Sequence, residues 1–185
     1  MAPALRLQQV RLGAVVAVAI AAGLGVWLAT RGSDQRAPIV PAAGPTGKQV
    51  VPITAAGLET LAGALGRPIY WAGQKAGSVY ELSQPSGRVY VRYLPVGAKA
   101  GANVAALTVG TYPVSNAFAA TQRIAGRSDS IQVPVTGGAI AFYAKGAPSS
   151  VYVAFPGSSV QIEVYDPVPA EARKLVSSGK IVALR

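Results

Sequence analysis

The chain has 185 residues, of which 51% are hydrophobic and 13% are charged, and its formal net charge is +10. The charged share is about half the ~25% of an ordinary soluble domain, so we expect part of the chain to lie outside water. Cysteine and histidine are both absent. Their absence excludes disulfides, zinc sites built from His or Cys, and catalysis of the Ser-His-Asp or Cys-His type.

The positive charge is spread thinly along the chain. The closest basic groups are Arg88 with Arg92 and Arg173 with Lys174. A nucleic-acid interface needs a denser basic stripe with interleaved aromatic residues, whereas diffuse charge can also attract anionic lipid or wall polymer. We therefore predict no nucleic-acid partner, and the composition suggests no cofactor.

The strongest single pattern is an apolar run at residues 12–30. It reads LGAVVAVAIAAGLGVWLAT, which is 19 uncharged residues between Arg11 and Arg31. A helix of that length spans about 28 Å, close to the ~30 Å hydrocarbon core of a bilayer. A cleaved signal peptide has a shorter apolar core of about 7–15 residues, ending in small residues. Trp27 and Leu28 occupy that end here, so we predict a retained transmembrane helix at 12–30 that contacts the lipid bilayer.

The rest of the chain divides around this segment. Residues 1–11 are predicted to be a cytoplasmic tail, 31–49 a Pro/Gly linker, and 50–185 an extracytoplasmic domain. Basic residues flank both ends of the apolar run, so the positive-inside rule is nearly balanced. The orientation therefore rests on the usual arrangement of a signal anchor. The predicted location is the cell membrane, with a single pass and a cytoplasmic N-terminus.

Helix signals occur at three places in the domain. Apolar residues at helical spacing predict a helix over Ala55–Leu65, capped by Thr54 and ended by Gly66. A second helix is predicted to be capped by Ser115 or Asn116 and to end near residue 125. A third is predicted from a cap at Asp166 through residue 178.

Strand signals fill the intervals between these helices. Apolar alternation and turn residues predict strands at 69–72, 79–83, 88–94, 107–112, 131–135, 139–144, 151–155, 160–165 and 181–184. The short spacings favour antiparallel pairing. The fold class is therefore α+β, with an antiparallel sheet and about three helices on one of its faces. The element order also suggests a duplicated unit of one helix and four strands.

Alternation along the strands assigns their side chains to two faces. One face is apolar, and the other collects Tyr90, Arg92, Tyr143, Tyr152, Gln161, Glu163 and Tyr165. Tyrosine and arginine are favoured in interfaces, and flat rings can also stack on sugars. The candidate partner-binding residues are Tyr90, Arg92, Tyr152, Glu163 and Tyr165. The alternative is an ordinary solvated sheet face, which cross-strand pairs stabilise by ~0.2–1 kcal/mol each.

Candidates for catalysis are few. Glu163 and Asp166 lie on either side of a predicted strand end, and Glu81 lies on another strand. A glycosidase needs two carboxylates facing each other across a cleft, and Glu163 could pair with Glu81. Asp166 is already expected to cap a helix. We therefore predict that the protein is not an enzyme, with no catalytic residue and no metal site.

Three stretches carry a resemblance to a known group of proteins. They are RPIYWAGQKAGSVYELSQPSGRVYVRYLP, LTVGTYPVSNAF and VQIEVYDPVPAEARKLV, within residues 67–176. This region resembles small, uncharacterised single-pass membrane proteins of GC-rich, mainly actinobacterial, bacteria. The resemblance implies a membrane-anchored domain, and it implies neither an activity nor functional residues.

Two functions are consistent with these observations. The first is a non-enzymatic, membrane-anchored extracytoplasmic domain that binds an envelope partner, either cell-wall glycan or protein. The second is an accessory subunit of a multi-protein membrane complex. Gly13, Ala17 and Ala21 favour the second reading, because small residues at every fourth position allow close packing of membrane helices.

Overall fold

The computed structural model describes residues 50–185. The predicted tail at 1–11, transmembrane helix at 12–30 and linker at 31–49 lie outside the described residues. Among residues 50–185, none of the helices has the length and apolar character needed to cross a membrane.

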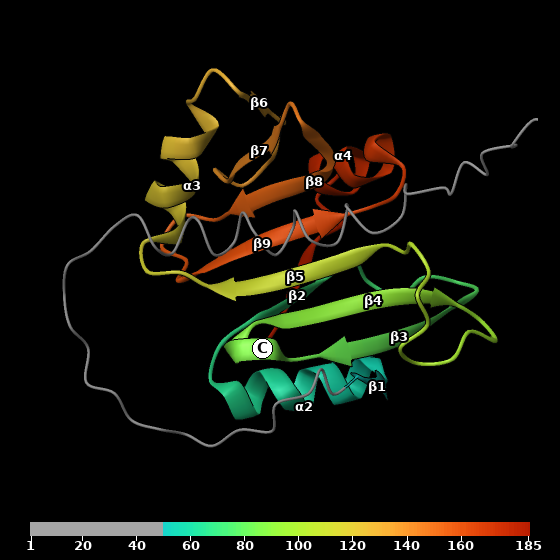
Figure 1. Cartoon of the computed structure of the whole chain (residues 1–185). Helices are drawn as coiled ribbons and strands as arrows, with labels where there is room; N and C mark the ends of the chain where they lie inside the picture. The colour runs from blue at the N-terminus through green and yellow to red at the C-terminus, as the bar shows by residue number, and fades with distance from the viewer. Residues whose placement is uncertain (1–49) are drawn as a thin grey trace, which may run out of the picture. The chain divides into compact units, whose positions relative to one another are not determined.

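The main element is one antiparallel sheet of eight strands in the order β1-β3-β4-β5-β9-β8-β7-β6. Figure 1 shows β5 and β9 side by side in its middle, where they join the earlier and later halves of the chain. The strands are β1 (Val50–Ile53), β3 (Ser78–Ser83), β4 (Val89–Pro95), β5 (Thr108–Pro113), β6 (Ser130–Gln132), β7 (Ile140–Ala144), β8 (Ala147–Ala154) and β9 (Val160–Tyr165). The predicted antiparallel α+β class is confirmed.

A second, two-stranded sheet pairs β2 (Ile69–Trp71) with β10 (Val182–Leu184). The backbone N–H of Tyr70 in β2 donates to the hydroxyl of Thr111 in β5 at 3.0 Å, and the N–H of Ala72 donates to the hydroxyl of Tyr93 in β4 at 2.7 Å. Side chains of the large sheet therefore satisfy the backbone of the small one.

Residues 50–185 contain three α-helices, α2 (Ala55–Leu65), α3 (Ala117–Ala125) and α4 (Pro169–Ser177). The bounds of α2 are as predicted. The Thr54 hydroxyl accepts from the N–H of Gly57 at 3.1 Å, and Gly66 adopts the left-handed conformation that ends the helix.

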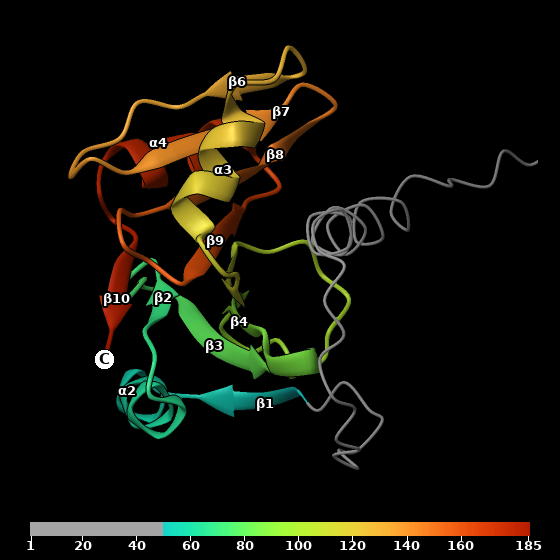
Figure 2. The ribbon, with the colours of Figure 1, turned by 90° about the vertical axis from the view of Figure 1, so that its left-hand side faces the viewer.

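The apolar face of the large sheet carries the main core. Fully buried side chains from its central strands include Val91, Val109, Val151, Ile162 and Val164. Leu58 of α2 and Ala172 of α4 belong to the same cluster, as does Ile69 of β2. Figure 2 shows α4, the β10–β2 pair and α2 along this one side of the sheet.

The expectation that all three helices cover one face is wrong, because α3 packs on the opposite face. Its Ala125 lies in a separate cluster with Phe142 of β7 and Tyr152 of β8. The hydroxyl of Thr121 in α3 accepts from the side-chain amide of Gln161 in β9 at 2.8 Å. The sheet is thus covered on both sides over β7, β8 and β9.

The element order matches the suggested repeat, since α2 is followed by β2, β3, β4 and β5, and α3 by β6, β7, β8 and β9. The strand pairing does not follow the repeat, because β2 leaves the large sheet whereas β6 forms one of its edges, and the unpredicted strand β1 forms the other. The two halves therefore differ in both pairing and helix placement.

Two predicted helix caps also need correction. Asn116 precedes α3 with φ 54°, and its side chain makes no capping bond. Asp166 accepts from the N–H of Val168 at 2.8 Å in a turn, so α4 begins later, at Pro169.

The core assignment predicts a contrast between two isoleucines of the same sheet. Ile162 in β9 is 0% exposed, whereas Ile131 in the edge strand β6 is 39% exposed. Ile162→Ala should cost about 2–5 kcal/mol of unfolding free energy through lost burial and a residual cavity. Ile131→Ala should cost less than ~1 kcal/mol. Thermal melting of both variants checks this, and equal losses would contradict the assigned core.

Candidate functional site

The strand register places the five predicted partner-binding residues on one face of one sheet. Tyr90 lies opposite Gly110 of β5, which lies opposite Glu163 of β9, which lies opposite Tyr152 of β8. In the next row, Arg92 lies opposite Thr108, which lies opposite Tyr165. The predicted common face is therefore present, but its exposure differs from the expectation.

Glu163 is buried at the centre of this face, with 4% of its surface exposed. Its Oε2 accepts a short hydrogen bond from the hydroxyl of Tyr112, and its Oε1 accepts one from Ser150 at 2.7 Å. The hydroxyl of Tyr152 lies 3.4 Å from the same Oε1. The carboxylate is therefore enclosed by hydroxyl donors, as a buried charged group requires.

The position of the Tyr112 side chain depends on Gly110, which lies two residues earlier in the same strand, β5. A Cβ at Gly110 would lie 2.8 Å from the hydroxyl oxygen of Tyr112. Glycine inside a strand often marks such a close approach. Gly110 thus leaves the space through which the Tyr112 ring reaches Glu163.

Burial raises the pKa of Glu163 above its ordinary value of 4.5, because the desolvated carboxyl group favours its neutral form. The hydroxyl donors and the positive charge of Arg88 oppose this rise. Burial also raises the pKa of Tyr112, so its hydroxyl stays protonated and remains a donor. The Arg88 guanidinium lies 5.6 Å from the centre of the Tyr112 ring.

Arg92 is used in a different internal contact. Its guanidinium donates to Glu81 at 2.5 Å and to the carbonyl oxygens of Ala102 and Val104 at 3.1 and 2.8 Å. The second oxygen of Glu81 accepts from the N–H of Gly101 at 2.6 Å. The ion pair therefore holds the loop of residues 96–107 against the sheet.

The predicted exposed tyrosine face is wrong for two of its members. Tyr152 and Glu163 are buried at 3% and 4% exposure, beside α3 and the Tyr112 ring, so neither can touch a partner directly. Tyr90 and Tyr165 are half-buried, and Tyr90 packs edge-on against Tyr112. Binding through Tyr90, Arg92 or Tyr165 stays a prediction.

The prediction that Tyr143 lies on this face is wrong, because its side chain lies on the opposite face of the sheet. Phe142 is the β7 residue that pairs with Tyr152 and stacks on it at 5.4 Å. Tyr143 instead packs on the main core, with the guanidinium of Arg173 in α4 at 5.3 Å from its ring centre.

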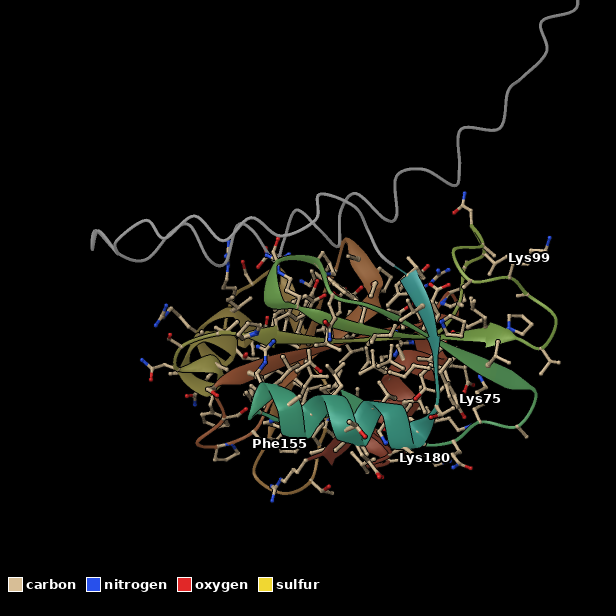
Figure 3. All side chains as sticks on the ribbon, turned by 90° about the horizontal axis from the view of Figure 1, so that it is seen from below. Lys75, Lys99, Phe155 and Lys180 are labelled. Carbon is tan, nitrogen blue, oxygen red and sulfur yellow. The ribbon has the colours of Figure 1, made fainter. Side chains whose placement is uncertain are left out.

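A different place on the domain offers open space to a ligand. An open hollow of about 520 Å³ lies where the small sheet meets the turn after β8. The rings of Tyr70 and Phe155 stack there with their centres 5.7 Å apart and their planes at 8°. Phe155, labelled in Figure 3, is half-buried. The hollow is also lined by Pro68, Pro156, Gly157, Ser158, Ser159, Ile181, Ala183 and Arg185.

Sequence reasoning missed both the hydroxyl donors around Glu163 and this hollow. Gly110 inside a strand was a signal for a close approach by a large neighbour such as Tyr112. No comparable signal marks the hollow, since Tyr70 lies in β2 of the small sheet and Phe155 in the turn after β8 of the large one.

Residues 50–185 contain no group of three or more acidic, His or Cys side chains that could hold a metal ion. Comparison of the chain with protein-family models, curated proteins and solved structures gave no match.

The environment of Glu163 predicts a pH dependence of stability. A folded-state pKa above the unfolded value stabilises the fold below about pH 4.5, and this contribution is lost as the pH rises through the folded-state pKa. Glu163→Gln should remove that loss and flatten the dependence of unfolding free energy on pH above 4.5. Denaturant titrations across this range measure it. Glu171→Gln, at an exposed site on α4, is the matched control and should keep the original slope.

Proposed function

We propose that this protein is a membrane-anchored extracytoplasmic domain that binds an envelope partner, cell-wall glycan or protein, without catalysing a reaction. The observation that carries the proposal is the open hollow with the stacked Tyr70–Phe155 pair. Concave sites lined by aromatic and apolar side chains, with few polar groups, are typical of ligand binding.

The use of the carboxylates supports a binding role over a catalytic one. Glu81 is paired with Arg92, Glu163 accepts from hydroxyls, and Asp166 accepts from the N–H of Val168. A hydrolase of the glycosidase type needs two carboxyl groups that reach the substrate. All three of these carboxylates are buried and lie outside the lining of the hollow.

The chemistry of the hollow favours a sugar-containing partner. The half-buried ring of Phe155 offers a flat apolar surface to a sugar ring, and the buried ring of Tyr70 stacks behind it. Arg185 and the exposed Ser159 at the lining supply hydrogen-bond donors for hydroxyl or acidic groups. Cell-wall glycan is therefore the first candidate, and an envelope protein is the second.

The membrane location in this proposal rests on the sequence. The uncharged run at 12–30 is long enough to span a bilayer, and the resemblance of residues 67–176 to small membrane-anchored proteins agrees with it. The orientation, with the N-terminus in the cytoplasm and the domain outside, belongs to the proposal.

A second candidate is an accessory subunit of a multi-protein membrane complex. The small residues Gly13, Ala17 and Ala21 favour lateral packing of the predicted membrane helix. Purification in mild detergent tests this candidate, since it predicts membrane subunits that co-purify at fixed stoichiometry.

The hollow predicts a loss of binding when its half-buried aromatic ring, Phe155, is removed. Phe155→Ala should lower retention of the protein on isolated wall material by about tenfold or more, because truncating a central aromatic contact commonly costs at least 1–2 kcal/mol of binding. Co-sedimentation measures the retained fraction. Phe118→Ala on α3, a half-buried ring on the other face of the sheet, is the matched control and should be retained normally.

Other outcomes of this experiment are also informative. Equal retention of both variants would contradict binding at the hollow. Loss of retention in Tyr165→Ser alone would instead place the partner at the half-buried tyrosines of β4 and β9.

The proposed orientation predicts that the domain is accessible from outside the cell. Protease added to intact spheroplasts should degrade residues 50–185, which immunoblotting against the domain detects. Protection until the cells are lysed would place the domain in the cytoplasm and contradict binding to the wall.

A further inference from the structure

One end of the large sheet carries exposed apolar side chains at the start of β3 and in the loop that follows β4. Val96 is 70% exposed at the end of β4, and Val79 and Val104 are 40% and 41% exposed. We call these three residues, with Lys75 and Lys99, the valine–lysine end. Large apolar side chains gathered at an exposed tip are a mark of an interaction surface.

The backbone places these residues close together. Val79 lies opposite Leu94 in the β3–β4 pair, and the N–H of Val96 donates to the carbonyl of Gly77 at 3.1 Å. The carbonyl of Val104 accepts from Arg92, which lies opposite Glu81 in the same pair. Figure 3 shows Lys75 and Lys99 at this same end of the domain.

The loop that carries Val96 and Val104 is held in place by two side chains of the large sheet, Glu81 and Arg92. Glu81 accepts from the N–H of Gly101, and Arg92 donates to the carbonyls of Ala102 and Val104. A loop held by a part-buried ion pair can present its apolar tip without first being ordered on binding, which lowers the entropic cost of association.

Charge at this end has one sign. Residues 73–79 and 95–107, which cover the start of β3, the end of β4 and the adjoining loops, contain Lys75 and Lys99 and no acidic residue. The nearest carboxylate within this pair of strands, Glu81, is buried and paired with Arg92. The surface that remains is apolar at its tip and positive at its sides.

We propose that the valine–lysine end docks on an anionic lipid surface. The valines enter the region between headgroups and acyl chains, and the two lysines lie level with the lipid phosphates. A protein partner fits this surface less well, because residues 73–79 and 95–107 contain none of the Tyr, Trp or Arg residues that dominate protein interfaces. This inference goes beyond the proposed function, since it uses neither the hollow nor the predicted transmembrane helix.

The docking is compatible with a tethered domain. Val50, where the described chain begins, pairs with Ser83 at the far end of β3 from Val79. Six strand residues cover only about 20 Å, whereas an extended linker of the predicted length reaches about 60 Å. A tether of that reach lets this end of the domain face the bilayer.

The absence of cysteine from the chain allows a direct test on the full-length protein. Val96→Cys is labelled with an environment-sensitive fluorophore, and the protein is reconstituted in vesicles of phosphatidylcholine with or without phosphatidylglycerol. We expect a blue shift and higher intensity only with phosphatidylglycerol, and a reversal at high salt because screening weakens the attraction. Gln122→Cys on α3, an exposed site on another element, is the control and should not respond.

Two lysine substitutions test the charge. Lys75→Gln with Lys99→Gln, added to the labelled Val96→Cys protein, should weaken docking by roughly 30-fold, the effect of about 1 kcal/mol for each lysine near an anionic surface. Thermal melting should be unchanged, since both lysines are exposed. A label at Val104→Cys provides a second reporter at the same end.

Four results would overturn the proposal. They are no response with either lipid, an equal response with neutral and anionic lipid, an unchanged response in the double lysine variant, and the same response to soluble inorganic polyphosphate without vesicles. None of them bears on binding at the hollow, because retention on wall material and the Phe155→Ala variant measure that separately.

Discussion

The pairing of β5 with β9 holds the two halves of the sheet together, and it places a carboxylate at the centre of the protein. Glu163 of β9 lies opposite Gly110 of β5, so no side chain from that position can pair with it. The carboxylate instead accepts hydrogen bonds from the hydroxyls of Tyr112 in β5 and Ser150 in β8, the two strands beside β9. A buried acidic group needs such donors, so the small residue at 110 and the two hydroxyls are parts of one arrangement.

The helices that cover the two faces of the large sheet decide which surfaces are open to a partner. Because α3 covers β7, β8 and β9 on the side of Glu163, the polar residues there serve the interior. The other side is filled by α2, α4 and the small sheet, but β10 and the turn after β8 leave the hollow beside Tyr70 and Phe155. A ligand in the hollow therefore contacts the edge of the small sheet and the turn after β8, and not the face of the large sheet.

Burial also changes the balance of charge at the surface. Three of the six acidic residues in 50–185 are buried, namely Glu81, Glu163 and Asp166, whereas none of the twelve Lys and Arg residues there is. The solvated surface is thus more basic than the composition of the domain suggests. That excess favours anionic surroundings such as lipid headgroups and acidic wall polymers, and it links the two binding proposals.

Local sequence determined the parts of this protein whose stability is local. The bounds of α2 follow from a hydroxyl at Thr54 and a left-handed glycine at Gly66, and both act within one helical turn. Period-two alternation likewise located most strands and placed Tyr90, Arg92, Tyr152, Glu163 and Tyr165 on one face, because successive strand residues point to opposite sides.

Tertiary structure alone decided which of those side chains are exposed. Alternation cannot show that α3 would cover Tyr152, nor that the pairing of Phe142 with Tyr152 would put Tyr143 on the core side. The hollow was the hardest feature to predict, since it is built around the pairing of β2 with β10, which lie far apart in the sequence. Such contacts depend on how distant segments pack, and no pattern within one segment carries that information.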